Sequence, residues 1–517
     1  MALVTSAALV ASGMTLLPAT AAPRGQACEV RNNNTIDKLL ECVTAAGAME
    51  HLEAFQQIAD ENDDNRAAGT SGYEASVDYV VEVLEAAGWT VTIDEFPYTY
   101  VGPSSLTQLA PIVAEYETGP FTGSGAGDVT AAVTPVDLQL TLGNTSTSGC
   151  DAADFAGFTA GTIALIQRGG CNFSIKALNA EAAGASAVVI FNQGDADTDA
   201  RKGLIVGTLG GSDVVGIPVV GASYDQGVAL AQGGSQANVF VPAPESRPQK
   251  NVIAEKTGRN DDNVVMAGAH LDSVQAGPGI NDNGSGSAAL LEIAENMSKL
   301  KPQNTIRLAW WGAEESGLIG SEEYVAGLSQ EEKDRIALYL NFDMVASPNY
   351  IFMVYDGDES GFEAPVTVPA GSIEIEDLFE SYYTSVGEPY EDAEFSGRSD
   401  YQAFIENGIA AGGLFTGAEV VKTEAQQEIW GGVAGESFDQ CYHQACDTID
   451  NVNGHALDVN SDAIALAILR YAYSTEEVNG VRGVPVPGGV KLPAPAGPEG
   501  TFGSAAGGAG GGGLEHD

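Results

Sequence analysis

The sequence predicts an α/β fold in which a mostly parallel central sheet has helices on both faces. Three segments, 264–268, 305–312 and 337–342, are almost continuously apolar, and helical patterns separate them. Such strands are typical of a parallel sheet that is buried on both sides. The chain of 517 residues is too long for one compact core. We therefore also expect a second, inserted domain of mixed β and α structure.

The elements of the central domain follow in chain order. Segments 48–60 and 72–88 have the apolar spacing of amphipathic helices, and the second is followed by a strand at 89–93. After residue 251 strands and helices alternate, with helices expected at 287–300, 316–328 and 458–473. These parts predict one main domain made of residues 22–100 and 249–475.

Residues 101–248 have a different composition, rich in Gly, Thr, Ser and Val. Short apolar strands at 162–166 and 187–191 flank a helical segment at 174–183. The segment has its own hydrophobic pattern and its own pair of cysteines, so we interpret it as the inserted domain.

The sequence predicts that the two ends of the chain lie outside the folded domains. Residues 1–21 contain an apolar run followed by Ala19-Thr20-Ala21, a small-x-small cleavage pattern typical of a signal peptide. Residues 476–517 are rich in Pro and Gly, which predicts a flexible tail. We expect the mature protein to be secreted and extracellular.

Charge and cysteine content agree with that compartment. The chain has 71 Asp and Glu against 22 Lys and Arg, a net charge of −49, which argues against nucleic acid or an anionic membrane as a partner. Six cysteines allow 15 pairings. Proximity in the sequence suggests the pairs 28–42, 150–171 and 441–446, typical of oxidising environments.

Metal-ligand residues follow the predicted strands and loops. In an open α/β sheet, ligands bind at the carboxyl ends of the strands. His270, Glu315 and Asp343 come at the ends of three strands, Asp282 precedes a helix, and His443 lies between two cysteines. Mixed imidazole and carboxylate ligands suit zinc, and five of them suit two ions that share one carboxylate.

Longer motifs around these residues resemble the secreted bacterial dizinc aminopeptidases of the aminopeptidase S and aminopeptidase Y family. The motifs are His270-Leu271-Asp272-Ser273, Gly279-Ile280-Asn281-Asp282-Asn283-Gly284-Ser285-Gly286-Ser287, Ala309-Trp310-Trp311-Gly312-Ala313-Glu314-Glu315, Leu340-Asn341-Phe342-Asp343-Met344 and Cys441-Tyr442-His443. The resemblance covers roughly 48–100 and 248–475 and implies a zinc exopeptidase-like fold. Residues 101–248 resemble a protease-associated domain, most clearly at 166–173.

The resemblance implies a role for each matching residue. Asp282 would bridge two zinc ions, His270 and Asp343 would complete one, and Glu315 and His443 the other. It also implies that the Asp282–Asn283 peptide is cis.

Further roles concern the catalytic residues. Glu314 would be the general base acting on a zinc-bridging hydroxide, Tyr442 would hydrogen-bond the developing oxyanion, and Asp272 would orient the imidazole of His270. Arg398, in the run Gly397-Arg398-Ser399-Asp400, would line the site, although Tyr401 stands where the family often has His. Asp458 and Asp462 match positions where some relatives bind calcium.

The expected function is therefore removal of N-terminal residues from peptides or proteins by a monomeric zinc aminopeptidase. Three alternatives remain. A related dizinc carboxypeptidase would use the same zinc ligands and a cluster of Arg, a glutaminyl cyclase would keep one zinc, and a receptor-like relative without activity would have lost ligands.

Overall fold

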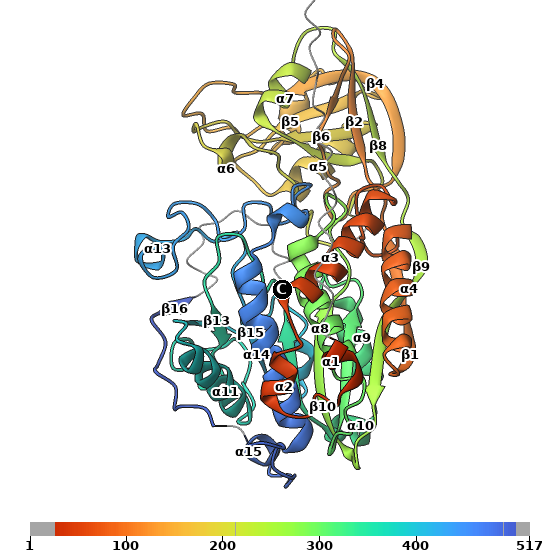
Figure 1. The fold of residues 1–517 in the computed structure, drawn as a ribbon. Helices are drawn as coiled ribbons and strands as arrows, with labels where there is room; N and C mark the ends of the chain where they lie inside the picture. The colour runs from red at the N-terminus through yellow and green to blue at the C-terminus, as the bar shows by residue number, and fades with distance from the viewer. Residues whose placement is uncertain (1–25, 212–213, 490, 503–517) are drawn as a thin grey trace, which may run out of the picture.

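The structure is a computed structural model that describes residues 26–211, 214–489 and 491–502. The predicted signal peptide at 1–21 lies outside these residues. The chain forms two sheets, and the smaller one stands as a separate lobe above the larger (Figure 1).

The larger sheet has nine strands in the order β1-β9-β11-β10-β12-β15-β13-β14-β16. The strands are β1 Thr90–Tyr100, β9 Glu245–Lys256, β10 Asn260–His270, β11 Asn304–Trp311, β12 Ile336–Phe342, β13 Met353–Tyr355, β14 Glu391–Ala393, β15 Ala411–Phe415 and β16 Thr501–Phe502. Strands β11, β10, β12 and β15 are parallel neighbours, whereas β1, β9 and β13 join by antiparallel pairing. The predicted mostly parallel sheet is confirmed.

Helices cover both faces of this sheet. The helices of this part of the chain are α1 Gln26–Val30, α2 Ile36–Leu40, α3 Ala45–Asp60, α4 Ser71–Ala86, α8 Ser285–Asn296, α9 Ile319–Gly327, α10 Gln330–Arg335, α11 Ser372–Val386, α12 Gln402–Glu406, α13 Glu424–Trp430, α14 Gly454–Tyr473 and α15 Glu476–Asn479. Val265 of β10 packs in the core that contains α3, α4, α8, α11 and α14. Its neighbour Met266 packs in the opposite core with α9 and α12. Successive side chains of a strand point to opposite faces, so a continuous apolar run is what two covered faces require.

The smaller sheet is built only from residues 105–241, among those the structure describes. Its strands are β2 Ser105–Ala110, β3 Ala114–Tyr116, β4 Gly127–Val136, β5 Ile163–Gln167, β6 Ala187–Phe191, β7 Val219–Ala222 and β8 Gln236–Val241, in the order β3-β2-β8-β4-β5-β6-β7. Helices α5 Phe173–Ala182, α6 Asp199–Lys202 and α7 Tyr224–Leu230 accompany it. Two hydrophobic cores belong to this lobe alone.

The boundaries of the insert differ slightly from the expected 101–248. Strand β9 begins at Glu245, and its pairing with β1 extends to the pair Tyr100 and Glu245. Residues 245–248 therefore continue the large sheet. Strand β9 is antiparallel to both β1 and β11, so β1 runs parallel to β11. The insert follows the end of β1 and therefore leaves the sheet at the same edge as the end of β11.

The flexible tail predicted for 476–517 stays a prediction, but parts of its described segment contact the main domain. Val486 is 3% exposed and packs into the main core, and β16 pairs with β14. Composition alone missed this packing because one buried apolar side chain and two backbone pairs suffice to hold an extended segment.

All three predicted disulfides are present: Cys28–Cys42, Cys150–Cys171 and Cys441–Cys446. Among the described residues, no helix is both long and apolar enough to span a bilayer.

Candidate active site

Parallel pairing brings three predicted ligand segments to one sheet edge. His270, the last residue of β10, is paired with Trp311 of β11, and Gly268 with Asn341 of β12. The turn after Trp311 carries Glu314 and Glu315, and Asp343 follows β12 directly. The carboxyl ends of these neighbouring strands therefore deliver His270, Glu314, Glu315 and Asp343 to one place.

The loop before α8 places Asp282 at the same edge. The Asp447 carboxylate accepts hydrogen bonds from the backbone N–H groups of Asn281 and Asp282, at 2.9 and 3.0 Å. The Asp282–Asn283 peptide is cis, as the family resemblance implied. A Cβ at Gly286 would lie 2.2 Å from the Phe342 carbonyl oxygen, so only glycine lets α8 approach the end of β12 this closely.

Two clusters of potential metal ligands share Asp282. One consists of His270, Asp282 and Asp343, the other of Asp282, Glu315 and His443, with the ligand atoms of each cluster within 4.8 Å of one another. His270 Nε2 lies 3.4 Å from Asp282 Oδ1 and 3.3 Å from Asp343 Oδ1. His443 Nε2 lies 3.2 Å from Asp282 Oδ2 and 2.9 Å from Glu315 Oε2.

These distances fit tetrahedral metal coordination. Ligand atoms about 2.0–2.1 Å from zinc at tetrahedral corners are roughly 3.3 Å apart. Buried Glu315 Oε1 also lacks a hydrogen-bond partner, and Asp282 Oδ2 has the nearby His443 Nε2 but no hydrogen bond of acceptable geometry. Unpartnered buried carboxylate oxygens need a cation, so the five predicted ligands fit two metal ions that share Asp282.

The charges of the site point the same way. Burial, followed by the charge of Asp282, raises the pKa of Glu315 to about 7. Burial and the neighbouring carboxylates raise the pKa of Glu314 well above its ordinary value. Although burial opposes it, the carboxylates raise the pKa of His270 well above its usual range. Carboxylate charge is thus in excess here, and two dications would compensate it.

Asp272 holds the turn that carries Glu314 and Glu315. Its Oδ1 accepts from Glu314 N–H at 3.1 Å and its Oδ2 from Glu315 N–H at 3.3 Å. His270 Nδ1 instead lies 3.1 Å from the backbone carbonyl of Asp272 and 3.8 Å from its carboxylate. The carboxylate therefore positions the turn, and the carbonyl takes the contact to the imidazole that was expected of the side chain.

Several residues behind the ligands were not singled out from the sequence. Ser399 donates to Asp343 Oδ2 at 2.6 Å and accepts from Asn341 Nδ2 at 2.8 Å. The neighbouring Asp400 is 1% exposed, and burial, partly opposed by the charge of His270, raises its pKa to about 7. The sequence run at 397–400 indicated this segment, but only the contacts with Asp343 and Asn341 show that the Ser399 side chain reaches the ligands.

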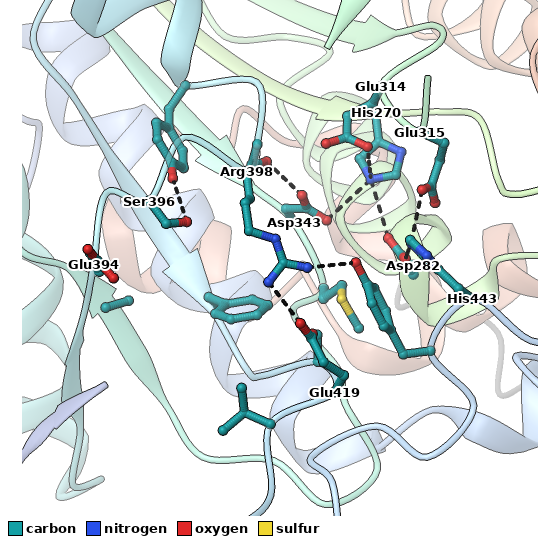
Figure 2. A pocket seen from close by; sticks show the side chains of 18 of the residues that line it. His270, Asp282, Glu314, Glu315, Asp343, Glu394, Ser396, Arg398, Glu419 and His443 are labelled. Carbon is teal, nitrogen blue, oxygen red and sulfur yellow. Dashed lines mark hydrogen bonds and ion pairs between the residues drawn. The ribbon is translucent and has the colours of Figure 1, made fainter. Parts of the chain in front are cut away.

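The opposite part of the pocket carries Tyr442 and Arg398. His443 and Tyr442 lie within the disulfide loop 441–446, and their rings stack with centroids 3.8 Å apart. Arg398 donates to Tyr442 Oη at 3.3 Å and pairs with Glu419 at 2.8 Å. Figure 2 shows the guanidinium of Arg398 directed towards Glu419, beside the cluster of His270, Asp282, Glu315, Asp343 and His443. Burial raises the pKa of Tyr442 well above its ordinary value, so the phenol stays protonated.

Asp458 and Asp462, the predicted calcium residues, lie on α14 and are not among the residues that line this pocket. Asp458 Oδ1 accepts from Ala45 N–H at 2.9 Å. Burial and the charge of Asp458 raise the pKa of Asp462 to about 7. Calcium at these residues stays a prediction.

The fold and site are those of a metal-dependent hydrolase, with histidine and carboxylate ligands gathered at the carboxyl edge of an open α/β sheet. Comparisons with known proteins agree. Residues 251–468 match peptidase family M28, and residues 129–230 match the PA domain. The chain is 52% identical over 450 residues to an aminopeptidase of Pseudomonas aeruginosa, covering 85% of this chain and 83% of that protein. It is 41% identical to a probable leucine aminopeptidase 2 of Aspergillus fumigatus, over 83% of each chain.

Solved structures give the same result. A zinc aminopeptidase from Bacillus subtilis superimposes with a TM-score of 0.61 at 27% identity, covering 82% of this chain and 94% of that one. An aminopeptidase from Aneurinibacillus sp. strain AM-1 gives 0.58 at 28% identity, covering 87% and 98%. The chain belongs to peptidase family M28, carries an inserted PA domain, and is a peptidase.

Proposed function

We propose that this peptidase is a secreted zinc aminopeptidase that removes single, large apolar residues from the N-termini of peptides. The supporting observation is the charge of the pocket. Carboxylates of Glu314, Asp343, Glu394 and Glu419 line it together with the ligands. A free α-amine is a cation, and such a pocket provides anionic partners for it.

The same pocket offers little to a substrate carboxylate. Among the described lining residues, Arg398 is the one Lys or Arg, and its guanidinium is already paired with Glu419. This argues against the carboxypeptidase alternative, which needs available positive charge. The presence of all five ligands argues against a receptor-like relative.

The side-chain preference rests on the apolar part of the pocket. Met344, Tyr355, Phe415 and Val420 line it. Burial of a leucine-sized side chain against such a wall contributes about 1.5–3 kcal/mol. The curated relatives named leucine aminopeptidase support the same preference.

The chain's own residues account for the proton movements. Zinc ions bound by the five ligands would supply an activated water nucleophile at neutral pH and electrostatic stabilisation of the transition state. Glu314 would take the proton of the attacking water and pass it to the leaving amine. Tyr442 accepts its hydrogen bond from Arg398, so its own O–H proton is free to be donated to the developing oxyanion.

Secretion is supported by the three disulfides and by the predicted signal peptide. The insert, which leaves the sheet at the edge of the site, would shape access for longer substrates. Its first residues contact the loop that follows His270, because Gln275 Nε2 in that loop donates to the Val101 carbonyl at 2.9 Å.

The test is steady-state hydrolysis of a panel of aminoacyl-anilides by zinc-loaded protein, with and without chelator. Leucine anilide should be cleaved, and its N-acetylated form should react about 10²-fold more slowly or worse, because the carboxylates lose their charged partner. Similar rates for the two substrates, or release of C-terminal residues from N-blocked peptides, would contradict the proposal.

A further inference from the structure

A second group of carboxylates lies behind the pocket wall. Asp356 and Asp358 follow β13, and Glu376 and Glu380 lie on α11. Oxygens of Asp356, Asp358 and Glu376 lie within 4.8 Å of one another. Asp356, Glu376 and Glu380 are only 2%, 4% and 7% exposed, whereas Asp358 is exposed.

A fifth carboxylate, Asp392 of β14, is directed into this group. In the parallel pairing of β13 and β14, Asp392 is opposite Val354. Paired residues point to the same face of a sheet, and Val354 packs in the core together with Phe379 of α11. Asp392 therefore faces α11. Its charge helps to raise the pKa of Glu380, so the two carboxylates interact electrostatically.

Asp392 also has no adequate partner. It is 1% exposed, and neither of its carboxylate oxygens makes a hydrogen bond of acceptable geometry. The nearby Ser360 hydroxyl lowers the pKa of Asp392, but burial raises that pKa by more. A fully buried carboxylate with two unpartnered oxygens is costly unless a cation compensates it.

Electrostatics among the five groups leads to the same conclusion. Burial, followed by the charges of Asp358, Glu380 and Asp356, raises the pKa of Glu376 to about 9. Burial and the charges of Asp356 and Asp358 raise the pKa of Asp392 to about 7. Without a counter-charge these side chains hold protons that carboxylates in water release.

We propose that Asp356, Asp358, Glu376, Glu380 and Asp392 bind one divalent cation of the calcium type. The ligands are all oxygens, and they come from a loop, a helix and a strand, an arrangement that suits the larger, more adaptable coordination of calcium better than that of magnesium. The run Asp356-Gly357-Asp358-Glu359-Ser360-Gly361 has Asp, Asp and Gly at positions 1, 3 and 6 of a calcium-binding loop, whereas Thr367 stands where that loop has its Glu, so the remaining ligands would come from α11 and β14.

The position of the site gives the cation a consequence. Tyr355 and Ala393, each adjacent to a proposed ligand, line the active-site pocket. The cation would fasten the β13–β14 edge of the sheet to α11 and thereby hold that wall of the pocket. Its binding does not depend on the peptidase activity proposed above.

The experiment compares zinc-loaded protein freed of other metals, as wild type, Asp392→Asn and Asp458→Asn/Asp462→Asn. The double variant is the matched control, because it removes the other pair of carboxylates for which calcium was predicted. Thermal unfolding is followed with calcium or magnesium added, and calcium stoichiometry is measured by titration calorimetry.

Calcium should raise the melting temperature of wild type and of the double variant by about 5 °C at a concentration roughly 100-fold above Kd. Asp392→Asn should lose this rise and one bound calcium, yet be at least as stable as wild type without calcium, because it no longer carries that buried charge. Glu376→Gln carries the same prediction, should either variant fail to fold.

Three outcomes would overturn the proposal: a full calcium effect in Asp392→Asn and Glu376→Gln, loss of the whole effect in the double variant, or no effect in wild type. An equal rise with magnesium would overturn the assignment to calcium.

Discussion

Replacing Glu314 by glutamine tests the catalytic role of the site most directly. The Glu314 side chain is 11% exposed, and its Oε2 lies 3.9 Å from His270 Nε2, beside the metal ligands. Glutamine keeps the shape, and the backbone N–H of residue 314 remains bound by Asp272. The substitution thus removes a proton acceptor without removing a proposed ligand.

The expected magnitude is that of a general base. Loss of such a base lowers the rate about 10²–10⁴-fold. Each factor of ten corresponds to about 1.36 kcal/mol, so the barrier should rise by roughly 2.7–5.4 kcal/mol. The apolar wall and the carboxylates of Asp343, Glu394 and Glu419 are unchanged, so KM for leucine anilide should rise far less than kcat falls.

Glu315→Gln is the contrasting variant. Glu315 Oε2 lies 2.9 Å from His443 Nε2, in the second ligand cluster. Neutralising it should lower zinc content, whereas Glu314→Gln should retain the wild-type content.

The assay is kcat and KM with leucine anilide, together with zinc analysis of each dialysed protein. Full activity in Glu314→Gln would refute the proposed mechanism. Equal loss of zinc in both variants would refute the separation of base and ligand roles.

Three further predictions address the metals and the acidic group. Dialysed protein should contain about two zinc ions per chain by elemental analysis, and chelation should abolish activity that zinc then restores; a stable value near one would favour the glutaminyl cyclase alternative. Ser399→Ala removes the hydroxyl that holds Asp343, so zinc affinity should fall about 10–100-fold in a competition titration, while Ser396→Ala, at another pocket serine, should leave it unchanged. In metal-free protein, the raised pKa of Glu376 means that the folded state keeps a proton that the unfolded state releases, so the stability that this proton contributes is lost as pH rises from about 4.5 towards about 9. The melting temperature of Glu376→Gln should therefore fall less over that range than that of wild type. Equal falls in the two proteins would contradict this prediction.

Much of the ligand set could be predicted from the sequence because its signals are local. Continuously apolar strands end next to His270, Glu315 and Asp343, and a strand end in a parallel sheet is where ligands gather. Cysteine pairs separated by 5, 14 and 21 residues could likewise be matched by proximity.

Tertiary structure decided what depends on contacts between distant parts of the chain. The Asp272 carboxylate reaches backbone N–H groups 42 and 43 residues away. Ser399 reaches Asp343 across 56 residues, and Asp447 holds Asp282 across 165.

The acidic group behind the pocket is of the same kind. Neither Asp356 nor Asp392 forms a pattern with the other in the sequence, and only the β13–β14 pairing and the packing of α11 bring them together. Local composition reports which segments are apolar, charged or turn-forming. Strand order and helix packing decide which buried polar groups come into contact. Both depend on how all the apolar segments pack into one core, so no single segment of the sequence reveals them.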